Sequence, residues 1–137
     1  MQIKDNTFLD SNVIIYYFGK NSPKLDISKE IIYSQSELTI STQVVNEFIS
    51  VCFKKLKLDS DEIIDKLEDV KSRFSIKYID ENTIAKAMQL KKSYNYSYYD
   101  SLILASALEN ECENIYSEDF QHSQLIEKKL KIINPYK

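Results

Sequence analysis

The chain has 137 residues, which suits one globular domain and is too short for two ordinary ones, so we expect a single domain over residues 1–137. Its 43% apolar residues and its balance of 18 basic against 21 acidic residues exclude a disordered chain and a polyanion-binding tail. It shows no apolar signal core near its start and no apolar run long enough to span a bilayer, so we expect a soluble, cytoplasmic protein with no membrane partner.

Hydrophobic periodicity and turn residues predict strands that alternate with helices. In chain order the predicted elements are strand 6–10, helix 12–18, helix 24–36, strand 38–41, helix 42–56, helix 60–73, strand 75–78, helix 81–93, helix 98–110, strand 113–117 and strand 131–133. Strands separated by helices need crossover connections, so the expected fold class is α/β, with a mainly parallel central sheet and helices on both faces.

Four acidic residues are the candidate functional residues, because the predicted elements bring them to one edge of the sheet. Asp10 and Asp119 follow short apolar runs, and ligands of parallel sheets bind just beyond the carboxyl ends of the strands. Helix amino ends face the same edge, which brings Asp100 and Glu47 towards them. Converging carboxylates predict a metal site, and ligands that are all oxygen favour Mg²⁺ or Mn²⁺.

Each acid also has a structural interpretation that the sequence leaves open. Asp10 and Asp119 can be turn residues, because Asp after a strand bonds nearby backbone amides. Glu47 borders the apolar stripe of its helix and can be a solvated flanking residue. Asp100 shares the apolar face of its helix, but its spacing from Ser97 is also that of a capping box.

Other chemistries have less support. Cys52 and Cys112 are far apart in the sequence, and His122 is the only histidine, so we expect free buried thiols and no zinc site. His122 itself is interpreted as a surface or loop-packing residue, with a minor role near substrate as the alternative. Gly19 is the only glycine, which excludes phosphate-cradling loops and the nucleophile elbow of a serine hydrolase.

Basic and aromatic groups supply candidate contacts to nucleic acid. The lysine groups are Lys54, Lys55 and Lys57, then Lys86, Lys91 and Lys92, then Lys128, Lys129 and Lys131. For any one group we favour the alternative explanation, which is that lysines near helix carboxyl ends complement the helix dipole and aid solubility. Tyr94, Tyr96, Tyr98 and Tyr99 form a cluster that invites base stacking, although we favour core packing or an oligomer contact.

The segments around the four acids resemble the ordered motifs of the PIN-domain family. These segments are 8–12, 43–48, 98–107 and 116–122, so the resemblance spans nearly the whole chain. It implies a compact three-layer α/β/α nuclease fold. Short members of the family are often VapC-type toxins, which are ribonucleases held inactive by a cognate antitoxin.

The resemblance also assigns roles to residues. It implies that Asp10, Glu47, Asp100 and Asp119 form the catalytic and metal-binding acidic quartet, with Ser11, Asn12 and Ser117 as small polar supports. Two positions depart from the family pattern: Gln121 replaces a frequent further acid, and Ser123 replaces a glycine that often follows the histidine. The first departure leaves open whether one or two metal ions bind, and whether Glu118 compensates.

From the quartet and the resemblance we predict a Mg²⁺- or Mn²⁺-dependent endoribonuclease that hydrolyses RNA phosphodiester bonds. We expect it to be the toxin of a toxin–antitoxin pair, with RNA, an antitoxin protein and a second copy of the chain as partners. Two alternatives remain. One is a non-catalytic nucleic-acid-binding or assembly module on the same fold, and the other is an RNA-processing nuclease without an antitoxin.

Overall fold

The computed structural model of the protein describes residues 6–35 and 37–137. Its strands are β1 (Asn6–Leu9), β2 (Glu37–Ser41), β3 (Ser75–Lys77), β4 (Asn114–Tyr116), β5 (Leu125–Ile126) and β6 (Leu130–Ile133). Its helices are α1 (Ser11–Tyr17), α2 (Pro23–Ser34), α3 (Thr42–Lys54), α4 (Ser60–Arg73), α5 (Glu81–Tyr94) and α6 (Tyr98–Glu109). None of the helices within these two ranges is both long and apolar enough to cross a membrane.

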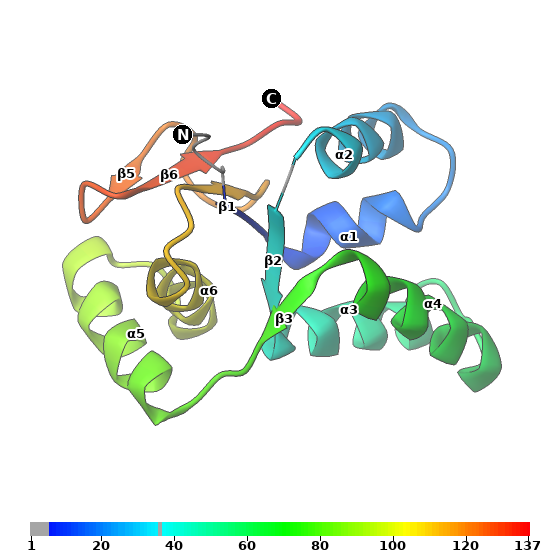
Figure 1. Ribbon diagram of the computed structural model, residues 1–137, viewed down its shortest axis with the longest axis horizontal. Helices are drawn as coiled ribbons and strands as arrows, with labels where there is room; N and C mark the ends of the chain where they lie inside the picture. The colour runs from blue at the N-terminus through cyan, green and yellow to red at the C-terminus, as the bar shows by residue number, and fades with distance from the viewer. Residues whose placement is uncertain (1–5, 36) are drawn as a thin grey trace.

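The strands of the described residues form one sheet in the order β3-β2-β1-β4-β6-β5, and only the β5–β6 pair is antiparallel. From β1 the chain moves outward to β2 and β3, and then returns across the sheet to β4. Because crossovers between parallel strands are right-handed, this reversal places α1 to α4 on one face and α5 and α6 on the other (Figure 1). The predicted three-layer α/β/α architecture with a mainly parallel sheet is therefore confirmed.

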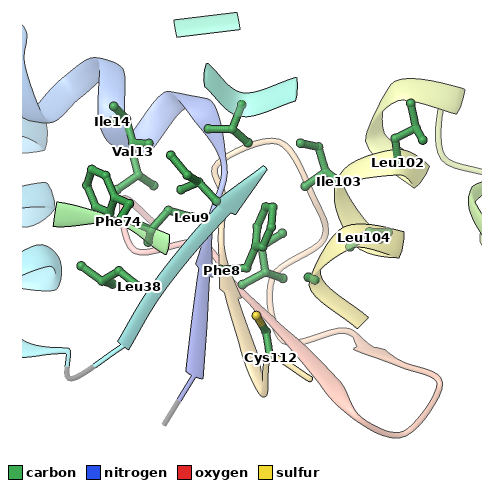
Figure 2. Close-up of a cluster of buried hydrophobic side chains, with 14 of the residues drawn as sticks. Phe8, Leu9, Val13, Ile14, Leu38, Phe74, Leu102, Ile103, Leu104 and Cys112 are labelled. Atoms are coloured by element: carbon green, nitrogen blue, oxygen red, sulfur yellow. The ribbon is translucent and has the colours of Figure 1, made fainter. Parts of the chain in front are cut away.

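Strand β1 runs through the middle of the core, and its side chains alternate between the two faces of the sheet. Phe8 and Leu9 have no exposed surface. In Figure 2, Leu9 lies on the side of α1, near Val13, whereas Phe8 lies on the side of α6, near Ile103. Since helices cover both faces, a polar side chain that follows β1 directly is held in dry surroundings at the rim of the core.

Most predicted elements match observed ones within a few residues, but one strand was missed. The predicted helix 24–36 ends at Ser34, and its last predicted position lies outside the described residues. Strand β5 was not predicted, because two residues show no periodicity. Its turn to β6 places Glu127 and Lys128 at φ values of 51° and 59°, where Asn or Gly is usual.

The order in which strands are added to the sheet reverses between β1 and β4, which creates a topological switch point. At such a point the two neighbouring crossovers leave in opposite directions, and a crevice opens at the carboxyl ends of the strands. Asp10 follows β1 directly, and Ser117 follows β4 directly. The carboxyl ends of β1 and β4 therefore lie at the edge of the sheet where a ligand can enter.

Candidate active site

Asp10 is the most deeply buried of the four candidate acids, with 4% of its surface exposed. Its backbone N–H donates to the Tyr116 carbonyl at 3.1 Å, which extends the β1–β4 ladder beyond the strand. One carboxylate oxygen accepts from the Ser11 N–H at 2.7 Å and caps α1, and the other accepts from the Ser117 hydroxyl at 2.7 Å. Asp10 thus has a capping role, but capping alone does not require a buried carboxylate fixed through both oxygens.

Ser117 links Asp10 to Asp119. It is fully buried, and its hydroxyl oxygen also accepts from the Asp119 backbone N–H at 3.1 Å. The Asp119 carboxylate accepts in turn from the Asn12 side-chain amide at 3.1 Å. One chain of hydrogen bonds therefore joins the ends of β1 and β4 to the first turn of α1, and all three predicted supporting residues, Ser11, Asn12 and Ser117, contact the acids directly.

Glu47 and Asp100 reach the same edge from helices on opposite faces of the sheet. Glu47 lies in the second turn of α3, which begins at the Ser41 cap, and Asp100 lies in the first turn of α6. Both residues are half-buried. The Ser11 hydroxyl interacts with the Glu47 carboxylate, so the residue after Asp10 connects α3 to the site.

The capping alternative for Asp100 is only half met. Ser97 caps α6, because its hydroxyl accepts from the Asp100 N–H at 3.1 Å. A capping box also needs a bond from the acid to the backbone N–H of the cap. Between these two described residues that second bond is absent, whereas α4 and α5 both have complete boxes. The Asp100 carboxylate interacts with the Ser97 hydroxyl instead, so the capping interpretation is met only in part.

The surroundings of Asp10 disfavour its charged form. Burial raises the pKa of Asp10 to about 7, the hydrogen bonds from Ser117 and Ser11 oppose this rise, and the negative charges of Glu47 and Asp119 add to it. Keeping a carboxylate with a pKa near neutrality ionised at pH 7 lowers the stability of the folded protein. Such a group is typical of a functional site.

The pKa values of Glu47 and Asp100 are raised as well. For Glu47 the largest cause is burial, opposed by polar contacts with Ser11 and Gln43 and increased by the charges of Asp100 and Asp119. For Asp100 it is again burial, opposed by the Ser97 hydroxyl and increased by Asp119. Each acid is thus within electrostatic reach of at least two of the other three. Among the described residues, no lysine or arginine forms an ion pair with any of the four.

This donor set fits a hard divalent cation better than a soft one. All four acids offer carboxylate oxygens, and Asn12 adds a side-chain oxygen that is buried without a hydrogen-bond partner. Within residues 6–35 and 37–137, however, no three acidic, histidine or cysteine side chains converge closely enough to form a complete metal site.

Glu118 does not add a fifth carboxylate to the quartet. Its side chain forms an ion pair with Lys24 of α2 at 2.7 Å and accepts a hydrogen bond from the Tyr16 hydroxyl of α1. The residue between Ser117 and Asp119 is therefore bound to helices on the α1 side of the sheet. Its role is to anchor the loop that follows β4.

The segment after Asp119 is held by backbone and loop contacts. The Gln121 N–H donates to the Tyr96 hydroxyl at 3.1 Å, and the His122 Nδ1 accepts from the Asn134 N–H at 3.0 Å. His122 thus has the loop-packing role that the sequence favoured. Ser123 has a φ of 70°, in the left-handed region, which explains why glycine suits this position in similar chains.

The predicted thiols and tyrosines mostly serve structure. Cys52 and Cys112 are free and buried, as expected. The Tyr94 hydroxyl accepts from the Glu127 N–H at 2.8 Å, and the Tyr96 hydroxyl donates to the Gln124 side chain, so both tyrosines hold the β5 segment. Tyr99 differs, because 66% of its surface is exposed.

Two lysines of the second predicted group have structural contacts. Lys86 pairs with Glu127 at 2.6 Å, and the amine of Lys91 donates to the Tyr96 carbonyl at 3.5 Å. Both lysines therefore help to fasten α5 to neighbouring segments. For the remaining lysines the contact with RNA phosphates stays a prediction.

The sequence of the chain matches the PIN domain family over residues 7–128. No curated protein sequence matches the chain. The family match covers the ends of β1 and β4 and the helices that bear Glu47 and Asp100.

Several solved structures share the fold. A toxin–antitoxin complex from Klebsiella pneumoniae has 20% sequence identity and a TM-score of 0.73, covering 96% of this chain and 98% of that chain. The DNA-bound VapBC of Salmonella typhimurium has 16% identity and a TM-score of 0.68, covering 93% and 96%. VapC20 of Mycobacterium tuberculosis, a Sarcin-Ricin loop cleaving toxin, has 11% identity and a TM-score of 0.67, covering 80% and 87%. At these identities the likeness establishes the fold.

Proposed function

Because the chain belongs to the PIN domain family, as its motifs predicted, we propose that it is a Mg²⁺- or Mn²⁺-dependent endoribonuclease. The observation that carries this proposal is the arrangement of Asp10, Glu47, Asp100 and Asp119. They come from four segments of the chain, lie within electrostatic reach of one another, and form no ion pair with a lysine or arginine among the described residues. Such uncompensated charge lowers stability, and binding a cation compensates it.

We assign the principal metal to Asp10, Asp100 and Asp119, with Glu47 sharing metal binding or orienting the attacking water. When bound, a divalent cation activates water and stabilises the leaving oxygen of a phosphodiester. Glu47 is half-buried and has polar contacts with Ser11 and Gln43, which would hold its carboxylate in place to orient the attacking water.

The supporting residues keep the acids in position. Ser117 fixes the carboxylate of Asp10 and the backbone of Asp119, and Asn12 holds the Asp119 carboxylate. Ser11 connects Asp10 with Glu47 through its N–H and its hydroxyl. In this proposal these residues are positioning residues, which orient the groups that bind the metal and the substrate.

The proposal extends to the toxin of a toxin–antitoxin pair, a role supported by the solved complexes that share the fold. The antitoxin would cover the acidic edge and place an arginine or lysine among the carboxylates, because a guanidinium or ammonium group can replace the charge of the metal. We further propose a homodimer that acts in the cytoplasm, where RNA and a co-produced antitoxin are both available.

Cleavage of single-stranded RNA by the purified chain tests the proposal. We expect Mg²⁺ or Mn²⁺ to support cleavage, excess EDTA to abolish it, and Asp10→Asn to lower it by roughly a hundredfold or more without changing the circular dichroism spectrum. Asp65→Asn on α4 is the matched control, because Asp65 is an exposed acid far along the chain from the motifs. Full activity in excess EDTA would eliminate the metal-dependent mechanism.

The cleavage assay, together with a growth assay and inspection of the adjacent reading frames, separates the two alternatives. A non-catalytic module would bind RNA and leave it intact with every metal tested. A processing nuclease would cut RNA, but its expression alone would not arrest growth, and no adjacent short reading frame would encode a partner that restores growth.

A further inference from the structure

A groove of about 450 Å³ opens beside the acidic site, between the first turns of α3, the segment before α5 and the start of α6. Its walls include Asn46, Glu47, Ile79, Tyr99 and Leu102. The volume falls in the range of roughly 300–1,000 Å³ that is typical of small-molecule sites. We propose that this groove binds one unpaired nucleobase of the RNA strand, next to the phosphodiester at the acidic site, an inference that rests on the proposed function.

The groove is continuous with the quartet through two residues. Glu47 lines the groove and is also within electrostatic reach of Asp100 and Asp119. Tyr99 lines the groove and is the residue immediately before Asp100. A ring placed in the groove would therefore lie beside the Glu47 carboxylate and next to the first turn of α6, which bears Asp100.

The chemistry of the walls suits a base. Tyr99 presents an aromatic ring, 66% of the residue being exposed, and Ile79 and Leu102 supply apolar surface. Unpaired bases are recognised by stacking on aromatic side chains. Asn46 is exposed on the rim, and its amide offers a donor and an acceptor to the edge of a base. The described residues that line the groove include no lysine or arginine, so a phosphate group is a poor occupant.

The groove is formed before any ligand binds. The Gln43 side chain of α3 donates to the Tyr99 carbonyl at 3.0 Å, and the Thr42 hydroxyl accepts from the Ile79 N–H at 3.3 Å. The rings of Tyr98 and Tyr99 make an edge contact with centroids 5.4 Å apart. Because these contacts join all three walls, a base would enter without the cost of ordering them.

Binding of single-stranded RNA to full-length protein tests the inference. The experiment uses the Asp10→Asn background with Mn²⁺, so that cleavage does not interfere, and a series of short RNAs with 2-aminopurine at each position in turn. We expect Tyr99→Ala to weaken binding about tenfold and to abolish the fluorescence quenching at one position of the RNA. Tyr99→Phe, which keeps the ring, should bind like the background protein.

Tyr33→Ala is the matched control, because Tyr33 is 64% exposed on α2 and does not line the groove. Removing the base at the quenched position should weaken binding as much as Tyr99→Ala, and the two changes together should cost no more than either alone. Circular dichroism checks that the variants are folded, and Tyr99→Phe decides between loss of the ring and loss of structure.

Several outcomes would overturn the groove assignment. The first is an equal RNA affinity of the Tyr99→Ala and Tyr33→Ala variants, and the second is no binding of RNA at all. The third is a Tyr99→Ala variant that loses self-association in sedimentation but keeps its RNA affinity, which would make the groove a protein interface. If the wild type cuts RNA while the Tyr99 variants bind RNA with normal affinity, the proposed nuclease activity is supported and the groove assignment is wrong. If Tyr99 quenches the fluorescence of the base but the wild type cuts no RNA, the groove assignment is supported and the proposed catalysis is wrong.

Discussion

Replacing Asp10 with asparagine should make the metal-free protein more stable at pH 7. The folded protein raises the pKa of Asp10 from 3.8 to about 7, chiefly by burial. Because the unfolded chain gives up this proton at lower pH than the folded protein, stability is highest below pH 3.8 and falls as the pH rises towards 7. At pH 7 the loss from this one group is about 4 kcal/mol.

Asparagine has nearly the same size as aspartate and carries no charge, so the variant avoids that loss. It keeps one side-chain oxygen, where Asp10 has two that accept from Ser11 and Ser117, and we assign about 1–2 kcal/mol to the weakened hydrogen bonds. The variant should therefore be more stable than the wild type by about 2–3 kcal/mol at pH 7. Near pH 4 the ionisation cost falls below about 1 kcal/mol, and the advantage should vanish or change sign.

Urea unfolding of both proteins in EDTA, followed by far-ultraviolet circular dichroism between pH 4 and pH 8, measures this difference. The matched control is Asp65→Asn, whose stability should follow that of the wild type at every pH, because Asp65 is exposed. An Asp10→Asn protein that is less stable at pH 7, or an advantage that does not shrink as the pH falls, would refute the reasoning and show that the Asp10 charge serves structure.

Three further predictions test other contacts. Asp100→Asn should lower RNA cleavage by roughly a hundredfold or more with a melting temperature that does not fall, because the substitution removes a charge that burial and Asp119 disfavour. Ser97→Ala should instead cost about 1 kcal/mol of stability through loss of the α6 cap and keep the metal dependence of cleavage. An active but readily unfolded Asp100→Asn protein would favour the capping interpretation. Mn²⁺ should raise the melting temperature of the wild type at pH 7. The rise should be smaller at pH 4.5, because protons compete there for carboxylates whose pKa values are raised. A melting temperature that does not change with Mn²⁺ at pH 7 would argue against the metal site. Ser123→Gly should stabilise the protein by about 0.5–1 kcal/mol in urea unfolding, because glycine adopts the φ of 70° without steric strain. An unchanged free energy of unfolding would mean that the Ser123 side chain has a compensating contact.

The alternation of elements and the candidate site could be predicted because their signals are local. Buried strands such as β1 appear as short apolar runs, and α3 and α6 begin at serine caps that the sequence displays. In a parallel sheet, the position of a residue relative to a strand end already indicates the edge at which it lies. Asp10 and Asp119 could therefore be assigned to one edge without coordinates.

Features that depend on contacts between distant segments were not accessible in this way. The sequence left open whether Glu118 joins the acids, and the structure binds it to Lys24, whose position on α2 depends on how that helix packs. The β5–β6 hairpin was missed because its turn lacks the usual residues and depends on the burial of Ile126 and Leu130. The role of Ser117 as the link between Asp10 and Asp119 became visible only through the register of β1 against β4.

The sequence by itself determined the order of the elements other than β5, the family and the four candidate acids, because periodicity, caps and motif spacing are properties of neighbouring residues. The tertiary structure alone decided how strongly those acids act on one another, since burial and mutual charge raise the pKa of Asp10 to about 7 only when four segments meet. It also distinguished Tyr99 from the tyrosines around it. Tyr94 and Tyr96 find hydrogen-bond partners in the β5 segment, whereas α3 and the segment before α5 leave the Tyr99 ring exposed along a groove. Packing of distant elements, which no local pattern encodes, thus separates a structural tyrosine from a candidate base-binding one.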